Sequence, residues 1–232
     1  MAGPISVVIP TLESARHLPR ALAPLVDGMA EGLIREVIVS DGGSRDETLE
    51  IADAAGCTLI SGEPGRAKQL LGGAARAKGK WLLFVHPDTA LARGWTDEVQ
   101  TFLSMPEARR RAAVFRLAFD DRSAKRALFW ARLRTQIMKL PHGDQGLLIS
   151  RFLYDGLNGF RDIAHEDIDF ASRIGAKRLV FLDTDAVTSA DKYRRGDSPA
   201  ANIGLMARYF LGGDPVELAR PQRSATRASS GV

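Results

Sequence analysis

Short apolar runs alternate with longer stretches of helical spacing through the first ninety residues of this chain. The runs are rich in β-branched residues, which favours strands, and the stretches between them place apolar residues three or four positions apart, as a helix does. Strands are expected at 5–9, 36–40, 57–61 and 81–85, and helices at 12–29, 44–55 and 66–78. This β-α-β-α-β-α-β order predicts an α/β fold with a Rossmann-like, mostly parallel central sheet flanked by helices.

The regular alternation of predicted strands and helices ends after Gly94. Helices are expected at 95–105, 166–174 and 202–211, and strands at 112–119, 146–149 and 179–182. Residues 123–140 predict a basic amphipathic helix, because apolar residues recur at helical spacing and no Asp or Glu falls between 122 and 139. No repeat or linker is visible, so we expect one domain over residues 1–220 and a disordered tail over 221–232.

Composition narrows the class of protein. The chain has 232 residues and a formal net charge of +4, a mild excess that indicates an anionic partner, and it carries no nucleic-acid-binding signature. Its one cysteine, Cys57, excludes an internal disulfide and indicates a reducing compartment, the cytoplasm. No apolar run reaches the roughly 20 residues that cross a bilayer, and the N-terminus leads straight into a strand, so we expect neither a membrane span nor a signal peptide.

Polar side chains follow three of the first four predicted strands. Since parallel strands end at the same edge of a sheet, these side chains should converge there. They are Thr11 and Glu13 after the first strand, Asp41 after the second, and Asp88 after the fourth, with His86 two residues before Asp88. An imidazole and a carboxylate two residues apart can share a divalent cation such as Mg²⁺ or Mn²⁺.

Turn and helix-cap roles are the alternative for each of these residues. Ser44 can cap the helix at 44–55, with Glu47 as its capping-box partner. Asp41 is expected to be an exposed loop carboxylate whose removal costs little stability. The first strand is followed by neither G-x-G-x-x-G nor a P-loop, which argues against dinucleotide oxidoreductases and P-loop enzymes.

Two early segments resemble the opening of family 2 glycosyltransferases of the GT-A fold: 5–13, with a strand and Pro10-Thr11-Leu12-Glu13, and 37–48, with a strand and Asp41-Gly42-Gly43-Ser44. Closer likeness to the arsenosugar-biosynthesis-type subgroup lies in 64–69, 84–89, 143–147, 166–170, 188–190 and 211–219. The resemblance covers about residues 4–220. It implies a nucleotide-sugar-binding half over 1–92 and an acceptor half over 93–220.

The resemblance also implies roles for single residues. Asp167 matches the catalytic base of the family, with Glu166 beside it. Asp88 and His86 would hold Mg²⁺ or Mn²⁺, although many relatives have Asp where this chain has His86. The nucleotide-sugar would be bound by Thr11, Glu13, Asp41, Gly43, Arg66, Asp144 and Lys192. The structural alternative for Glu166 and Asp167 is that their negative charges stabilise the N-terminus of the helix through its dipole.

The expected function is therefore a metal-assisted, inverting transfer of a sugar from a nucleoside-diphosphate donor, uridine-linked, to an unknown hydroxyl acceptor. Two alternatives stay open. A nucleotidyltransferase would need a Gly-rich pyrophosphate loop after the first strand, which Pro10-Thr11-Leu12-Glu13 is not. A nucleotide-sugar-binding protein without catalysis would bind the donor and turn nothing over. The basic helix at 122–140 could serve as an acceptor platform or as a weak peripheral membrane contact.

Overall fold

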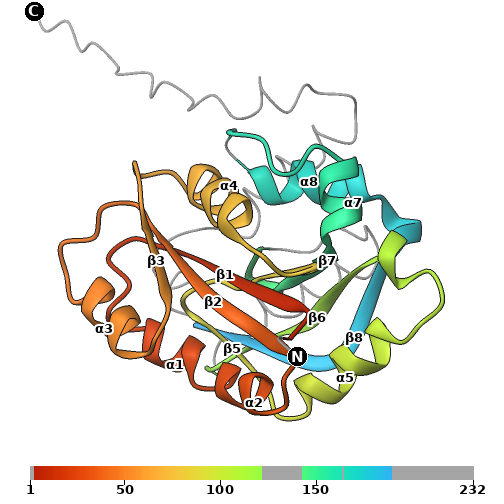
Figure 1. The fold of residues 1–232 in the computed structure, drawn as a ribbon, viewed down its shortest axis with the longest axis horizontal. Helices are drawn as coiled ribbons and strands as arrows, with labels where there is room; N and C mark the ends of the chain where they lie inside the picture. The colour runs from red at the N-terminus through yellow and green to blue at the C-terminus, as the bar shows by residue number, and fades with distance from the viewer. Residues whose placement is uncertain (1–2, 122–142, 164, 190–232) are drawn as a thin grey trace, which may run out of the picture.

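A computed structural model of the chain describes residues 3–121, 143–163 and 165–189 (Figure 1). Its strands form one eight-stranded sheet in the order β3-β2-β1-β4-β7-β6-β8-β5. The strands are β1 (Ile5–Thr11), β2 (Ile34–Asp41), β3 (Thr58–Ser61), β4 (Trp81–Phe84), β5 (Thr89–Leu91), β6 (Ala112–Phe119), β7 (Leu147–Ser150) and β8 (Leu179–Thr188). β1 to β4 pair in parallel, whereas β7 is antiparallel to both β4 and β6, so the predicted parallel sheet is mixed in its second half.

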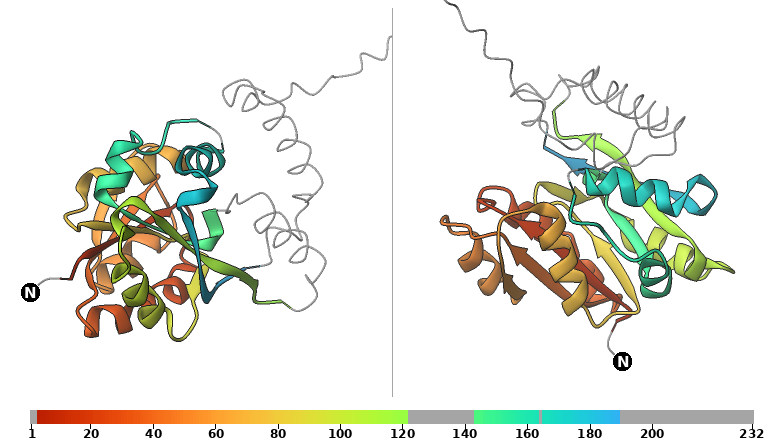
Figure 2. Two further views of the ribbon diagram at one scale, coloured as in Figure 1. Left: turned by 90° about the vertical axis from the view of Figure 1, so that its right-hand side faces the viewer. Right: turned by 90° about the horizontal axis from the view of Figure 1, so that it is seen from above.

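Helices cover both faces of this sheet (Figures 1 and 2). One face carries α1 (Leu18–Leu22), α2 (Leu25–Ala30), α3 (Thr48–Ala54) and α5 (Trp95–Leu103). The other carries α4 (Arg66–Arg76), α7 (Arg151–Gly156) and α8 (Glu166–Ile174). Within the described residues, no helix is long and apolar enough to cross a membrane.

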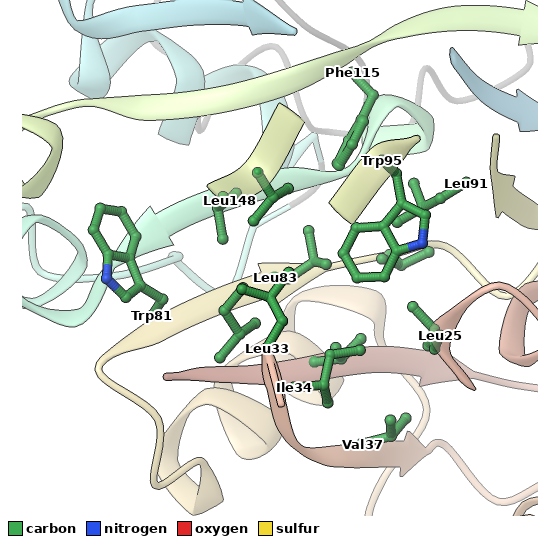
Figure 3. Close-up of a cluster of buried hydrophobic side chains, with 14 of the residues drawn as sticks. Leu25, Leu33, Ile34, Val37, Trp81, Leu83, Leu91, Trp95, Phe115 and Leu148 are labelled. Atoms are coloured by element: carbon green, nitrogen blue, oxygen red, sulfur yellow. The ribbon is translucent and has the colours of Figure 1, made fainter. Parts of the chain in front are cut away.

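The strands are buried on both faces because their side chains alternate between two apolar clusters. In β4, Trp81 and Leu83 enter the cluster under α1, α2 and α5, while Leu82 and Phe84 enter the one under α4, α7 and α8. Figure 3 shows the first cluster, in which Trp95 of α5 lies near Leu25 and Leu91. A continuous apolar run therefore predicted the buried strand correctly, because a sheet covered on both faces needs no polar alternation.

The sheet order changes direction beside β1. β2 and β3 lie on one side of β1, and β4 lies on the other. In open α/β sheets, ligands bind outside the carboxyl ends of the strands at such a switch point. This edge carries Thr11, Asp41 and the segment after β4, so the topology brings the predicted polar residues to the place where a ligand would bind.

Residues 12–29 were predicted as one helix, and that prediction is wrong. The structure has a loop followed by the short helices α1 and α2. Pro24, between them, has no N–H to continue the helical hydrogen bonds. In the loop, the Ser14 N–H donates to Thr48 Oγ1 (2.8 Å) and the Ala15 N–H to Asp46 Oδ2 (3.0 Å), which holds the chain away from helical geometry.

Three further expectations need correction. Ser44 does not cap α3, which begins at Thr48; its hydroxyl bonds to Asp41 instead. The strand β5 and the helix α7 were not predicted, since three and six residues are too short for a periodic signal. β8 runs to Thr188, beyond the predicted end at 182. The prediction stopped early because Asp183 and Asp185 interrupt the apolar pattern; both pair with Arg116 of β6.

Several expectations fall outside the described residues. They are the basic helix at 122–140, the late helix at 202–211, Lys192, and the disordered tail at 221–232.

Candidate active site

Asp41 lies at the end of β2, directly opposite Thr11 in the parallel register with β1. Its Oδ1 accepts hydrogen bonds from Thr11 Oγ1 (2.9 Å) and Ser44 Oγ (2.6 Å). Its Oδ2 accepts from the backbone N–H groups of Gly43 (2.8 Å) and Ser44 (2.7 Å). A carboxylate offers about four acceptor positions, so Thr11 of β1 and the loop after β2 together occupy all of them.

The prediction that Asp41 is exposed is wrong: only 1% of its surface is accessible. Burial raises its pKa, but the hydrogen bonds from Ser44, Thr11 and Gly43 outweigh burial, and the pKa lies below its ordinary value. Asp41 is therefore an ionised, fully bonded carboxylate that organises this loop. To accept a bond from a ligand, it needs one of the hydroxyls of Thr11 or Ser44 to rotate away.

Glu13 and Gly43 complete the same loop. The Glu13 N–H donates to Ser44 Oγ (2.8 Å), and Glu13 Oε1 accepts from the Arg45 N–H (2.8 Å), which joins the loops after β1 and β2. Gly43 has φ 95°, a left-handed value that a side chain would strain. Gln69 of α4 donates to the carbonyls of Thr11 and Ser40. We define Thr11, Glu13, Asp41, Gly43, Ser44 and Gln69 as the β2 loop network.

His86, Asp88 and Asp144 form a second group. Each offers one ligand atom, and these atoms all lie within 4.8 Å of one another. Opposite ligands of Mg²⁺ are separated by about 4 Å, so one nitrogen and two carboxylates at this spacing fit a single divalent ion. The sequence suggested His86 and Asp88 for this role; the structure adds Asp144, which had been expected only to bind the nucleotide-sugar.

Asp88 is held in place by two neighbouring residues and by one from a distant part of the chain. Its Oδ1 lies 2.5 Å from His86 Nδ1 and accepts hydrogen bonds from Thr89 Oγ1 (3.3 Å) and Thr188 Oγ1 (3.1 Å). The antiparallel pairing of β5 with β8 sets Thr89 opposite Thr188 and so delivers the second hydroxyl. Thr188 is thus a positioning residue that sequence reasoning did not single out, although it quoted Thr188-Ser189-Ala190 as part of a motif.

Glu166 and Asp167 begin α8, after His165 in a left-handed conformation (φ 60°). Asp167 Oδ2 accepts a hydrogen bond from the Gly143 N–H (3.0 Å), and its Oδ1 accepts from the Ile168 N–H (2.9 Å). Glu166 is buried, and burial raises its pKa above the ordinary value, against the lowering effect of Arg66. The two neighbouring carboxylates therefore sit in different environments.

Arg66, the first residue of α4, reaches across to both of them. Its Nε lies 3.0 Å from Glu166 Oε1, and its Nη2 lies 3.9 Å from Asp167 Oδ2. Burial lowers the pKa of Arg66, but the negative charges of Asp167, Glu166, Asp144 and Asp88 outweigh burial. The pKa of Arg66 is therefore raised above its ordinary value, and the guanidinium stays cationic. We call these four carboxylates the acidic cluster.

A cavity opens beside the acidic cluster, between α4, α8 and the sheet. Arg66, His86 and Asp167 are its charged or ionisable lining residues. The rest of the lining is apolar apart from Gly143: Pro10, Leu70, Phe84, Val85, Val114, Leu147, Phe160, Ala171 and Ile174. The cavity thus brings a carboxylate, a guanidinium and the imidazole of the candidate metal group within reach of one substrate, as a group-transfer site needs.

The predicted site residues fall into three linked groups. Thr11, Glu13, Asp41 and Gly43 share the β2 loop network; His86 and Asp88 are joined by Asp144; and Arg66 contacts Glu166 and Asp167. Lys192 lies outside the described residues. Sequence reasoning missed Ser44 as a ligand of Asp41, and it missed Gln69 and Thr188. Each lies in a quoted motif, but only strand pairing shows what it contacts.

Solved structures share this fold. The chain is similar to Staphylococcus aureus TarS 1–349, with 19% identity over 82% of this chain and 61% of that one, at a TM-score of 0.61. It is also similar to glucosyl-3-phosphoglycerate synthase from Mycobacterium tuberculosis, solved with Mn²⁺, uridine diphosphate and glucosyl-3-phosphoglycerate, with 20% identity over 90% and 77% of the two chains and a TM-score of 0.59.

A third similar structure is GalNAc-T7 with UDP, GalNAc and Mn²⁺, with 15% identity over 81% of this chain and 44% of that one, at a TM-score of 0.60. At these identities the likeness shows the fold, and it confirms the expected GT-A architecture. The chain spans 61% of the length of the TarS structure. No curated protein matches the chain.

The model of the family described as "Glycosyl transferase family 2" matches residues 6–151, which is more than half of the chain. The matched range contains the β2 loop network and all three residues of the metal group. The match names no subgroup, so the arsenosugar-biosynthesis-type subgroup stays a prediction. The chain belongs to glycosyl transferase family 2.

Proposed function

We propose that this chain transfers a sugar, with inversion, from a uridine-diphosphate-linked donor to a hydroxyl acceptor, with Asp167 as the general base. The carrying observation is that one short segment, Gly143–Gln145, serves two groups. Asp144 lies in the metal group, and the neighbouring Gly143 N–H binds Asp167. This supports a site in which the leaving diphosphate and the attacking hydroxyl are held a short distance apart.

In the proposed reaction the acceptor hydroxyl gives its proton to Asp167 as its oxygen bonds to the anomeric carbon of the donor sugar. The bond from that carbon to the diphosphate oxygen breaks, and the nucleoside diphosphate leaves with the bonding electrons. Asp167 lies at the N-terminus of α8, which stabilises its charged, proton-accepting form.

His86, Asp88 and Asp144 would hold Mg²⁺ or Mn²⁺, which when bound neutralises charge on the leaving diphosphate. Thr188 and Thr89 keep Asp88 oriented for this role. Asp88, Asp144, Glu166 and Asp167 place four negative charges around Arg66, and a bound cation would reduce their repulsion of an anionic diphosphate, which supports a metal requirement.

The nucleoside is proposed to lie against the β2 loop network, where Glu13 and Gly43 are exposed and the buried Thr11 and Asp41 hold the loop behind them. Uridine is chosen because two of the similar structures contain uridine diphosphate. Lys192, the acceptor half and a membrane contact through 122–140 remain predictions, because those residues lie outside the described ones.

Thermal-shift measurements with uridine diphosphate, with and without Mn²⁺, test the proposed donor site. A ligand at a hundred times its dissociation constant stabilises the folded state by about 2.7 kcal/mol, which is a readable shift. Asp88→Ala should abolish the Mn²⁺-dependent part of the shift. The matched control Asp97→Ala, an exposed carboxylate of α5 on the opposite face of the sheet, should leave it unchanged. An unaltered Mn²⁺-dependent shift in Asp88→Ala would overturn the metal assignment.

A further inference from the structure

Two carboxylates of α8, Asp169 and Glu166, each contact arginine, and the two contacts differ in their hydrogen bonding. Arg173 donates to Asp169 Oδ2 through Nε (2.9 Å) and Nη2 (2.6 Å), and Arg161 donates to Asp169 Oδ1 (3.2 Å). Arg66 Nε and Glu166 Oε1 lie 3.0 Å apart and are both buried, yet neither has a hydrogen-bond partner within the part of the chain that the structure describes. The first is a structural ion pair; the second leaves bonding capacity unused.

An unused buried donor and acceptor is costly, because both groups have lost water without gaining a bond. Folded proteins keep few such groups, and those they keep concentrate where a ligand completes the bonding. The Arg66 guanidinium also carries the opposite charge to a diphosphate, and it lines the cavity beside His86 and Asp167. Its loose contact with Glu166 is therefore the arrangement expected of a side chain that exchanges partners.

Arg66 also covers the proposed base. A side chain at position 143 would clash with Arg66 Nη2, so the guanidinium lies directly against the backbone that binds Asp167. Only glycine leaves room for the guanidinium there. While Arg66 stays in this place, an acceptor hydroxyl has to compete with it for Asp167 Oδ2.

We propose that Arg66 exchanges partners when the donor binds: it leaves Glu166 and Asp167 for the donor diphosphate, and Glu166 is the competitor that holds it in the donor-free protein. This rests on the proposed function. A guanidinium binds phosphate oxygens through two parallel hydrogen bonds, which outcompetes a single misaligned contact with a carboxylate. The exchange uncovers Asp167 only when a donor is present, which orders donor binding before acceptor binding.

A double-mutant cycle tests this exchange without a known acceptor. Uridine diphosphate affinity is measured by calorimetry at fixed, saturating Mn²⁺ for the parent chain, Glu166→Gln, Arg66→Gln and the double variant. Glu166→Gln should tighten binding about three- to tenfold, because the competitor for Arg66 has lost its charge. Arg66→Gln should weaken binding, and in that background Glu166→Gln should change affinity by less than about twofold.

Glu63→Gln is the matched control. Glu63 lies three residues before Arg66, is exposed and pairs with Lys68, so its removal takes away the same charge without freeing Arg66. Uridine diphosphate affinity should stay within about twofold of the parent value. Thermal unfolding of each variant establishes that it is folded. If Glu166→Gln does not fold, Glu166→Asp replaces it, because this change keeps the charge and shortens the side chain. Glu166→Asp should also tighten uridine diphosphate binding, and only in the presence of Arg66.

The outcomes separate the two proposals. If Glu166→Gln tightens uridine diphosphate binding equally with and without Arg66, Glu166 acts only by repelling the diphosphate. If Glu166→Gln does not tighten binding, Arg66 keeps its contact with Glu166 when the donor binds. Either result overturns the exchange and leaves the proposed function standing. A parent chain that does not bind uridine diphosphate at all would overturn the proposed donor, and the exchange with it.

Discussion

The β2 loop network and the acidic cluster are both built on buried carboxylates at one edge of the sheet, yet they are opposite in character. Asp41 accepts four hydrogen bonds and its pKa is lowered. Glu166 Oε1 faces Arg66 Nε without a hydrogen-bond partner among the described residues, and burial raises the pKa of Glu166. The first carboxylate is fully satisfied by its own chain, and the second is not.

This difference separates two tasks. A loop that shapes a binding surface benefits from rigidity, which complete hydrogen bonding provides. A group that responds to a ligand needs a second arrangement of similar free energy, which an incompletely bonded pair provides. We therefore expect replacements in the β2 loop network to act mainly on stability and replacements in the acidic cluster to act mainly on binding and chemistry.

The largest expected effect is on the reaction rate in Asp167→Asn. This change keeps the shape of the side chain and removes the proton acceptor, so transfer should fall by roughly two to four orders of magnitude. Uridine diphosphate affinity should stay within about threefold of the parent value, because the Asn amide oxygen can still accept the Gly143 N–H and Arg66 keeps Glu166 as its nearer partner. The measurements are steady-state transfer, once an acceptor is found, and calorimetry.

Glu166→Gln serves as the control for that variant and should slow transfer less, since it acts through Arg66 and not through proton transfer. Transfer at close to the parent rate in Asp167→Asn would remove the base assignment and make Asp144 or Glu166 the next residue to examine.

A smaller effect is expected on stability in Asp41→Ala. The change leaves the donors of Thr11, Gly43 and Ser44 without their acceptor, so the free energy of unfolding should fall by about 2–4 kcal/mol. Urea unfolding measures it, with Asp97→Ala expected to stay within about 0.5 kcal/mol of the parent chain. Uridine diphosphate affinity should fall as well. An Asp41→Ala protein as stable as the parent would erase the contrast between the two regions.

The smallest effect is on the pH dependence of stability, which has opposite sign in the two regions. The folded-state pKa of Asp41 is below its ordinary 3.8, so its contribution is present above 3.8 and is lost as pH falls through the folded pKa. The pKa of Glu166 is above its ordinary 4.5, so its contribution is complete below 4.5 and is lost as pH rises through the folded pKa.

Urea unfolding on either side of these two values measures both slopes. Asp41→Asn should flatten the loss of stability at the acidic end, and Glu166→Gln should flatten the loss above 4.5. Parallel pH profiles for the parent and Glu166→Gln would show that Glu166 keeps an ordinary pKa, and would weaken the view that the pair of Arg66 and Glu166 is incompletely bonded.

Much of the fold could be predicted from local patterns. The strand at 112–119 and the helix at 166–174 have the predicted bounds, because each has a strong periodic signal and a clear stop. The prediction failed at 12–29, where tertiary hydrogen bonds to Asp46 and Thr48 override an apolar spacing that is helical. It also failed at 89–91, where three residues form a strand only because β8 is available to pair with them.

The sequence by itself determined the order of strands and helices, and with it the edge of the sheet where Thr11, Asp41 and His86 lie. It also determined that Glu166 and Asp167 begin a helix, since these features depend on residues a few positions apart. Only the tertiary structure decided that Asp41 is buried, that Asp144 joins His86 and Asp88, and that Thr188 supports Asp88. Thr188 and Asp88 are 100 residues apart, and Arg66 is equally far from Glu166. Strand register and helix packing set such contacts, and no local periodicity encodes them.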